Sequence, residues 1–186
     1  MRAICLFPAM HRYAIQDERA KPIFDVAAAT PGTAVFVHCG VLSVGVRKKL
    51  GLPSPFDIRF GNPLDLQAIA LSQPQVPIII PHFGAGLFRE TLMVADLCPN
   101  VLLDTSSSNG WIKYVGLSLP AVFRQALAVV GPERLLFGSD SSFFPRGWVG
   151  HVHEQQSAAL DEIGASAEAR DQIFGGNFDR LFPQMP

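Results

Sequence analysis

The sequence predicts an α/β protein whose parallel sheet forms part of a (β/α)8 TIM barrel. Short apolar runs alternate with helical segments at a period of roughly 30 residues, the usual length of a βα unit. A polar residue follows three of these runs, namely His38, His82 and Asp140. The carboxyl ends of all barrel strands meet at one mouth, whereas an open, doubly wound sheet rarely uses every strand end. The repeated polar ends therefore favour the barrel.

Five apolar segments predict five parallel strands. The nearly pure aliphatic run before His82 is typical of a strand that is buried on both faces. The expected strands are residues 2–7, 34–38, 76–81, 101–104 and 134–137. Five strands cannot close an eight-stranded barrel, so we expect two open edges and an apolar interior that is incompletely covered.

Apolar residues at helical spacing predict helices between and after these strands. Asn62 is expected to cap a helix with Pro63 at its first position, and Gly131 to end the helix before the fifth strand. Residues 39–61 contain Gly and Pro but little periodicity beyond 44–50, which indicates an insertion over one face. The expected helices are residues 21–29, 62–71, 89–98, 118–130, 151–163 and 166–174.

Length and composition indicate a single globular domain spanning residues 1–186, with 48% hydrophobic residues to form its core. The net charge of −1, with both signs mixed along the chain, argues against nucleic acid or anionic lipid as a partner and favours a small molecule. Three cysteines without CxxC spacing argue against a disulfide framework, so we expect a cytoplasmic protein. No apolar run reaches membrane-spanning length.

The residues His38, His82 and Asp140 together predict a metal centre. Alone, His38 reads more simply as a core histidine, and Asp140 as the cap of the next turn with Ser139 and Ser141 as partners. Neutral imidazole and carboxylate are, however, the usual ligands of zinc-like divalent ions. Their repetition at strand ends therefore favours a shared site.

Other polar residues leave two interpretations open. His11 could contact substrate or pack within its loop, and Arg146 and Trp148 could clamp an anionic or aromatic substrate or simply fold over the core. His151 and His153 lie at an expected helix start, where residues two apart do not share a face, so we expect neither to bind metal. The Asp104-Thr-Ser segment is a further polar strand end, and its serines could contact a ligand or cap the helix that contains Trp111.

Five motifs taken in order resemble the second half of the amidohydrolase-related (amidohydrolase 2) metal-dependent hydrolases. The resemblance implies a barrel in which His38 and His82 match the histidines of strands five and six, and Asp140 matches the aspartate of strand eight. It also implies a divalent metal ion, zinc above all, that activates water for hydrolysis or positions an acid for nonoxidative decarboxylation. The motifs are VFVHCG, PHFGAG, NVLLDTS, RLLFGSD and IFGGNFDRLF.

The His-x-His of the family's first strand has no counterpart here, so the chain matches strands four to eight and is expected to be truncated at its N-terminus. By resemblance, His38 binds the metal, His82 binds it or orients the activated water, and Asp140 binds it and moves protons. The expected function is hydrolysis of a small organic or cyclic substrate. The alternatives are a decarboxylase and a noncatalytic remnant. We expect negligible activity from the chain alone, and association into a homo-oligomer or with a complementing N-terminal half.

Overall fold

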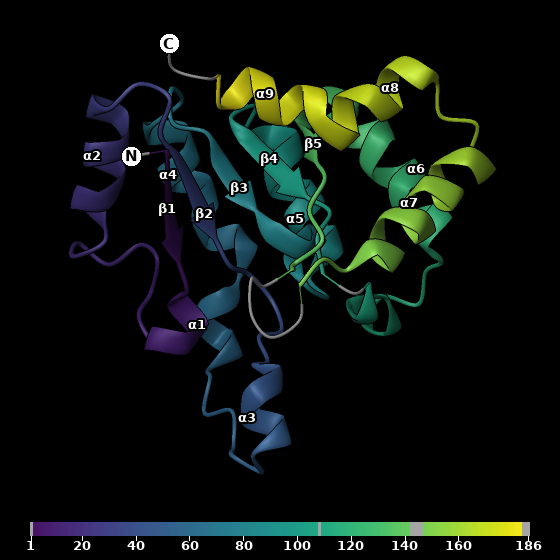
Figure 1. Cartoon of the computed structure of the whole chain (residues 1–186). Coiled ribbons are helices and arrows are strands. Elements are labelled where there is room, and N and C mark those ends of the chain that lie inside the picture. Colours follow the sequence, from purple (N-terminus) through teal and green to yellow (C-terminus); the bar gives the residue numbers. More distant parts are fainter. Residues whose placement is uncertain (1, 108, 142–146, 184–186) are drawn as a thin grey trace.

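A five-stranded parallel sheet forms the centre of the computed structural model, which describes residues 2–107, 109–141 and 147–183. The strands lie in sequence order, and each pairs in parallel with the next (Figure 1). This confirms the expected order, although the strands are mostly shorter than predicted. They are β1 (Ala3–Leu6), β2 (Ala34–Val37), β3 (Ile78–Ile80), β4 (Val101–Asp104) and β5 (Leu135–Leu136).

One face of this sheet packs against the main helices. Outward-facing strand residues such as Val35, Ile78 and Leu103 share a single core with Phe24, Phe123 and other helix residues. Because these helices bury one face against the sheet, their apolar residues recur at helical spacing, which is why the sequence predicted them. The helices that follow the first four strands are α2 (Lys21–Ala29), α4 (Gln67–Ser72) behind the 3₁₀ turn η2 (Pro63–Leu66), α5 (Phe88–Leu97) and α6 (Leu119–Val130).

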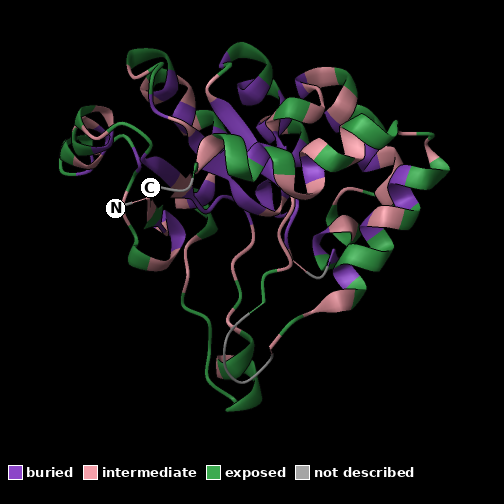
Figure 2. Cartoon of the chain, turned by 45° about the horizontal axis from the view of Figure 1, so that its top comes forward, coloured by how far each residue is buried: buried purple, intermediate pink, exposed green. Residues whose placement is uncertain are grey.

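The opposite face of the sheet carries a second, smaller apolar cluster. Side chains alternate along a strand, so Ile79, Leu102 and Leu136 point away from the first core. Leu181 and Phe182, at the end of the chain, pack over them. Figure 2 accordingly shows most of the central strands as buried. Both faces of the sheet are thus apolar, as in the wall of a barrel.

The C-terminal helical segment is longer than expected. Instead of ending at Phe174, it runs through α8 (Ala167–Asp171), a π turn (η6, Gln172–Gly176) and α9 (Asn177–Leu181). The Asn177 amide donates to the carbonyls of Pro132 (2.7 Å) and Leu135 (2.8 Å). These tertiary hydrogen bonds hold the helix in place beyond Phe174. The preceding helix, α7 (Gly150–Glu162), lies where predicted.

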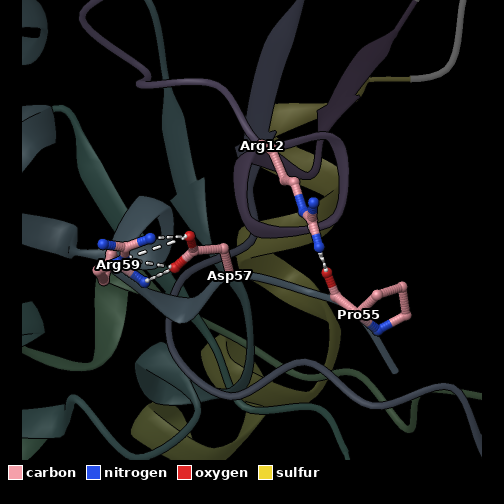
Figure 3. Close-up of polar contacts among 4 residues, drawn as sticks. All are labelled: Arg12, Pro55, Asp57 and Arg59. Atoms are coloured by element: carbon pink, nitrogen blue, oxygen red, sulfur yellow. Dashed lines mark hydrogen bonds and ion pairs between the residues drawn. The ribbon is translucent and has the colours of Figure 1, made fainter. Parts of the chain in front are cut away.

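The predicted insertion projects beyond the carboxyl ends of the strands, at the bottom of Figure 1. It contains α3 (Gly45–Lys49) and the 3₁₀ turn η1 (Ile58–Gly61). Arg12, just after the unpredicted short helix α1 (Pro8–His11), donates to the Pro55 carbonyl at 2.6 Å (Figure 3). Asp57 pairs with Arg59 at 2.6 Å and caps η1. The end of the insertion is therefore held by hydrogen bonds against the segment that follows β1.

In the part of the chain that the structure describes, none of the helices combines the length and apolar character that crossing a membrane requires.

Candidate functional site

His38 and His82 meet at the carboxyl ends of β2 and β3. Their ring centroids lie 5.2 Å apart, with the ring planes at 64°. His38 continues the direction of β2, since its backbone N–H donates to the Leu6 carbonyl at 2.9 Å. The Phe7 ring also stacks on the His38 ring, with centroids 6.0 Å apart. The structure thus brings together two of the three predicted metal ligands.

The His38 side chain is buried and incompletely satisfied. It is only 5% exposed, and its Nδ1 atom has no hydrogen-bond partner among the described residues. Burial, aided by the nearby His82, lowers the pKa of His38 from its ordinary 6.5 to about 4. The ring is therefore neutral near pH 7, and one of its nitrogens has a lone pair that can bind a metal ion. A buried polar atom without a partner costs free energy, so this nitrogen suits a ligand that the chain does not itself supply.

His82 lies in a left-handed backbone turn. The φ angles of His82, Phe83, Gly84 and Ala85 are 58°, 50°, 79° and 44°. Such a conformation is unfavourable for residues with a Cβ atom and survives only where the surroundings impose it. Here the Ala85 N–H donates to the His82 carbonyl at 2.8 Å, and the His82 N–H donates to Asp104 Oδ1 at 3.3 Å. The turn directs the His82 ring toward His38.

Close packing of the backbone supports this turn. A Cβ atom on Gly40, which follows His38 and Cys39, would lie 2.0 Å from the Gly84 carbonyl oxygen. The Val41 N–H donates to the Ala85 carbonyl at 2.9 Å. The chain after β2 and the chain after β3 are therefore in direct backbone contact. This contact explains why glycine is needed at position 40.

Asp104, the last residue of β4, and Ser106, just after it, form a hydrogen-bonded cluster with His82. Ser106 Oγ lies 2.8 Å from His82 Nδ1, and the same hydroxyl makes a short hydrogen bond to Asp104 Oδ1. The Ser106 backbone N–H also donates to that oxygen, at 2.9 Å. Burial raises the pKa of Asp104 above its ordinary value, against the opposing effect of these donors.

Sequence reasoning noted Asp104 and Ser106 as a polar strand end but did not include them among the site residues. The signal that selected His38 and His82, a polar residue directly after an apolar strand, applies equally to Asp104. What the sequence did not reveal was the partner: the hydroxyl of Ser106 joins the carboxylate of β4 to the imidazole of β3.

A second buried network ties this cluster to helix α7. Gln156 is fully buried; its amide nitrogen donates to the Thr105 carbonyl at 2.6 Å, and its oxygen accepts from the Thr105 hydroxyl at 2.7 Å. The same nitrogen donates to Asn109 Oδ1 at 3.3 Å. Thr105 lies between Asp104 and Ser106, so Gln156 fixes the turn that presents both residues to His82.

Asp140 differs from the two histidines. It is exposed and follows the short edge strand β5 with a positive φ of 52°. Among the described residues, no group of three or more His, Cys, Asp or Glu side chains is placed to hold a metal ion. The structure therefore does not assemble His38, His82 and Asp140 as a metal-holding set. It is Gly138 that approaches the cluster, because a Cβ atom there would lie 2.6 Å from Asp104 Oδ2.

The remaining candidates lie outside the buried cluster. His11 is exposed at the end of α1, and Trp148 is 67% exposed with its ring edge-on to Phe137 at 6.4 Å. Arg146 falls outside the described residues. His151 and His153 lie at the start of α7, as predicted, and both are exposed. The His153 ring packs against Phe174, with centroids 4.7 Å apart.

Solved structures share this fold. An uncharacterized TIM-barrel protein from Bordetella bronchiseptica matches with a TM-score of 0.69 and 22% identity, over 97% of this chain and 57% of that one. A zinc-bound amidohydrolase from Burkholderia multivorans matches with a TM-score of 0.62 and 18% identity, over 92% and 59%. The 5-carboxyvanillate decarboxylase from Sphingomonas paucimobilis matches with a TM-score of 0.62 and 14% identity, over 100% and 59%.

These likenesses confirm the predicted partial barrel. The chain spans less than two thirds of the length of each of the three proteins. At the level of sequence, the model of the family Amidohydro_2, described as amidohydrolase, matches residues 1–184. With nearly the whole chain matched and a parallel sheet of the barrel type, this protein belongs to the amidohydrolase 2 family.

Proposed function

We propose that the carboxyl ends of β2 to β4 form part of a metal-dependent hydrolase site for a small organic or cyclic substrate. The observation that carries the proposal is the contact between the buried His38 ring and the partly buried His82 ring, in which His38 Nδ1 has no partner among the described residues. Neutral imidazole is a common ligand of zinc and related ions. A pair of them at the ends of parallel strands is a rigid set of donors.

The residues take separate roles in this proposal. His38 is a metal donor, and His82 binds the ion or orients the water that attacks the substrate. Asp140 forms no metal-holding group with the two histidines in the described residues, so we propose that it joins them as third donor and proton carrier only when an ion binds. A bound divalent ion would supply Lewis acidity and lower the pKa of water. His11, Arg146 and Trp148 are the proposed substrate contacts.

Zinc affinity tests the proposal directly. The metal-free chain would be titrated with zinc against a chromophoric chelator, in parallel with His38→Ala and with His151→Ala as a matched control on α7. We expect His38→Ala to bind zinc at least about tenfold more weakly than the wild type, and His151→Ala to bind it equally well. Tenfold is the lower end of the loss in affinity seen when a residue that supports a metal ligand is removed, so loss of a ligand should cost at least as much. Equal affinity of the wild type and His38→Ala would contradict the proposal.

Nonoxidative decarboxylation is the second candidate reaction, supported by the fold shared with the decarboxylase from Sphingomonas paucimobilis. Because the chain alone is expected to have negligible activity, zinc-loaded protein complemented with the first three βα units of a relative would be incubated with a panel of lactones and amides and with a panel of hydroxybenzoic acids. A hydrolase releases acid by adding water across a C–O or C–N bond, whereas a decarboxylase releases CO₂ and leaves a C–H bond. Release of a carboxylic acid from the lactones or amides would support hydrolysis. Release of CO₂ from the hydroxybenzoic acids would instead support decarboxylation.

The open sheet edges support a partner. β1 and β5 are the outer strands of the described sheet, and unpaired edge groups favour association. We propose that a second copy of the chain, or a complementing half-barrel, covers them. Light scattering after gel filtration should give a mass above 20.2 kDa. Addition of the first three βα units of a relative should raise zinc affinity. A monomeric chain whose zinc affinity does not rise when those units are added would exclude both the second copy and the complementing half-barrel as partners.

A further inference from the structure

We propose that Ser106 and Asp104 are positioning residues that hold His82 in the tautomer protonated on Nδ1, which leaves the lone pair of Nε2 as the nitrogen that the site uses. The inference about the tautomer stands on hydrogen-bond geometry; the use of Nε2 by a metal ion or a water molecule rests on the proposed function.

The Asp104 carboxylate accepts three hydrogen bonds through one oxygen atom. Its Oδ1 atom receives the Ser106 N–H at 2.9 Å, the His82 N–H at 3.3 Å and the Ser106 hydroxyl. Backbone N–H groups can only donate, and a proton on Oδ1 would leave that oxygen a single lone pair for two of them; Oδ1 is therefore assigned as the unprotonated, accepting oxygen. Burial favours a protonated Asp104, but its proton would then reside on Oδ2, away from the donors.

The Ser106 hydroxyl then fixes the proton of His82. A serine hydroxyl has one hydrogen to donate, and here it points to Asp104 Oδ1. Ser106 Oγ therefore faces His82 Nδ1, 2.8 Å away, with a lone pair. A hydrogen bond between these atoms needs a proton on Nδ1. In the neutral ring, Nε2 is then unprotonated, because each neutral imidazole carries a single N–H.

Rigid surroundings keep these atoms aligned. Gln156 clamps both the carbonyl and the hydroxyl of Thr105, the residue between Asp104 and Ser106. The left-handed turn at His82 fixes the other end. Ser106 and Asp104 are both buried, which limits competition from water. A buried network of this kind selects one tautomer more firmly than an exposed hydrogen bond does.

The tautomer can be read by NMR of the metal-free, full-length chain labelled with ¹⁵N, at a pH of about 8, above the ordinary imidazole pKa. Long-range ¹H–¹⁵N spectra distinguish a protonated from an unprotonated ring nitrogen. We expect Nδ1 of His82 to be the protonated one and Nε2 the unprotonated one. The reverse assignment in the wild type would overturn the proposal without any variant.

Substitutions then assign the cause. Ser106→Ala removes the hydroxyl, so the His82 pattern should shift toward the Nε2-protonated form that predominates in free histidine. Ser106→Thr keeps a hydroxyl and should retain the wild-type pattern. Ser107→Ala, one residue away and outside this chain of hydrogen bonds, should change nothing, and the His151 ring serves as an internal reference. An unchanged His82 pattern in folded Ser106→Ala would refute the role of Ser106. Because no metal is present, this outcome is independent of the zinc titration.

Discussion

The ends of β2, β3 and β4 contrast with the end of β5. At the first three, His38, His82 and Asp104 lie in or beside a buried network in which each strand end contacts the next. At β5, Asp140 is exposed and Trp148 is 67% exposed. Both regions showed the same sequence signal, a polar residue after an apolar strand. Convergence therefore depends on neighbours on both sides, which β5, as an edge strand, does not have.

Backbone contact provides the largest expected difference between the two regions. Gly40→Ala would place a Cβ atom 2.0 Å from the Gly84 carbonyl oxygen at a φ of +76°, whereas Gly147→Ala, at +65°, meets nothing within 4 Å. Overpacking and left-handed strain together should cost Gly40→Ala about 4 kcal/mol of unfolding free energy, against about 1 kcal/mol for Gly147→Ala. Urea denaturation of both variants would measure the difference. Similar losses would show that the close contact between the strand ends is absent in solution.

The buried histidine should make stability depend on pH. The pKa of His38 is about 4 in the folded protein and 6.5 ordinarily, so the unfolded chain binds more protons between these values. The free energy of unfolding should therefore fall as the pH drops from about 6.5 to about 4, by about 3 kcal/mol for this group.

The His38→Gln variant lacks the titrating ring and isolates the contribution of His38. The free energy of unfolding of the wild type minus that of the variant, measured with chelator present, should decrease as the pH is lowered from about 6.5 to about 4. A flat difference for His38 would mean that its ring is solvated rather than buried.

The smallest expected effect concerns two adjacent glutamines on α7. Gln156→Leu breaks the buried hydrogen bonds to Thr105 and should cost about 2 kcal/mol, because the partners are left unsatisfied. Gln155 is exposed and makes one hydrogen bond, to Asn109 at 2.9 Å. Gln155→Leu should cost under about 1 kcal/mol. Thermal unfolding of the two variants would measure both losses of stability. Equal losses would show that the hydrogen bonds of Gln156 to Thr105 do not stabilise the turn.

Much of the fold could be predicted from the sequence, because periodicity and burial coincide here. The aliphatic run of β3 and the capped turn at Asn62 are local signals, and both were correct. The extension of the last helix beyond Phe174 was missed, since it depends on hydrogen bonds from Asn177 to residues some 42 to 45 positions away. Local patterns contain no record of such partners.

The site was predictable only as a set of strand ends. His38 and His82 were identified, and their proximity follows from adjacent parallel strands. The link from His82 through Ser106 to Asp104 depends on a left-handed turn, which the sequence PHFGAG does not announce because three of the residues with positive φ are not glycine. Tertiary contacts override local preference at this turn.

X-ray absorption at the zinc edge tests the central claim most directly, because it counts the imidazole ligands of the bound ion. With protein in excess over zinc, we predict two histidine ligands in the wild type, one in His38→Ala and in His82→Ala, and two in His151→Ala. Asp140→Ala should retain both histidines and lose one oxygen ligand. A zinc environment without imidazole, or one that neither His38→Ala nor His82→Ala alters, would contradict the assignment of these two histidines as the metal-binding part of the site.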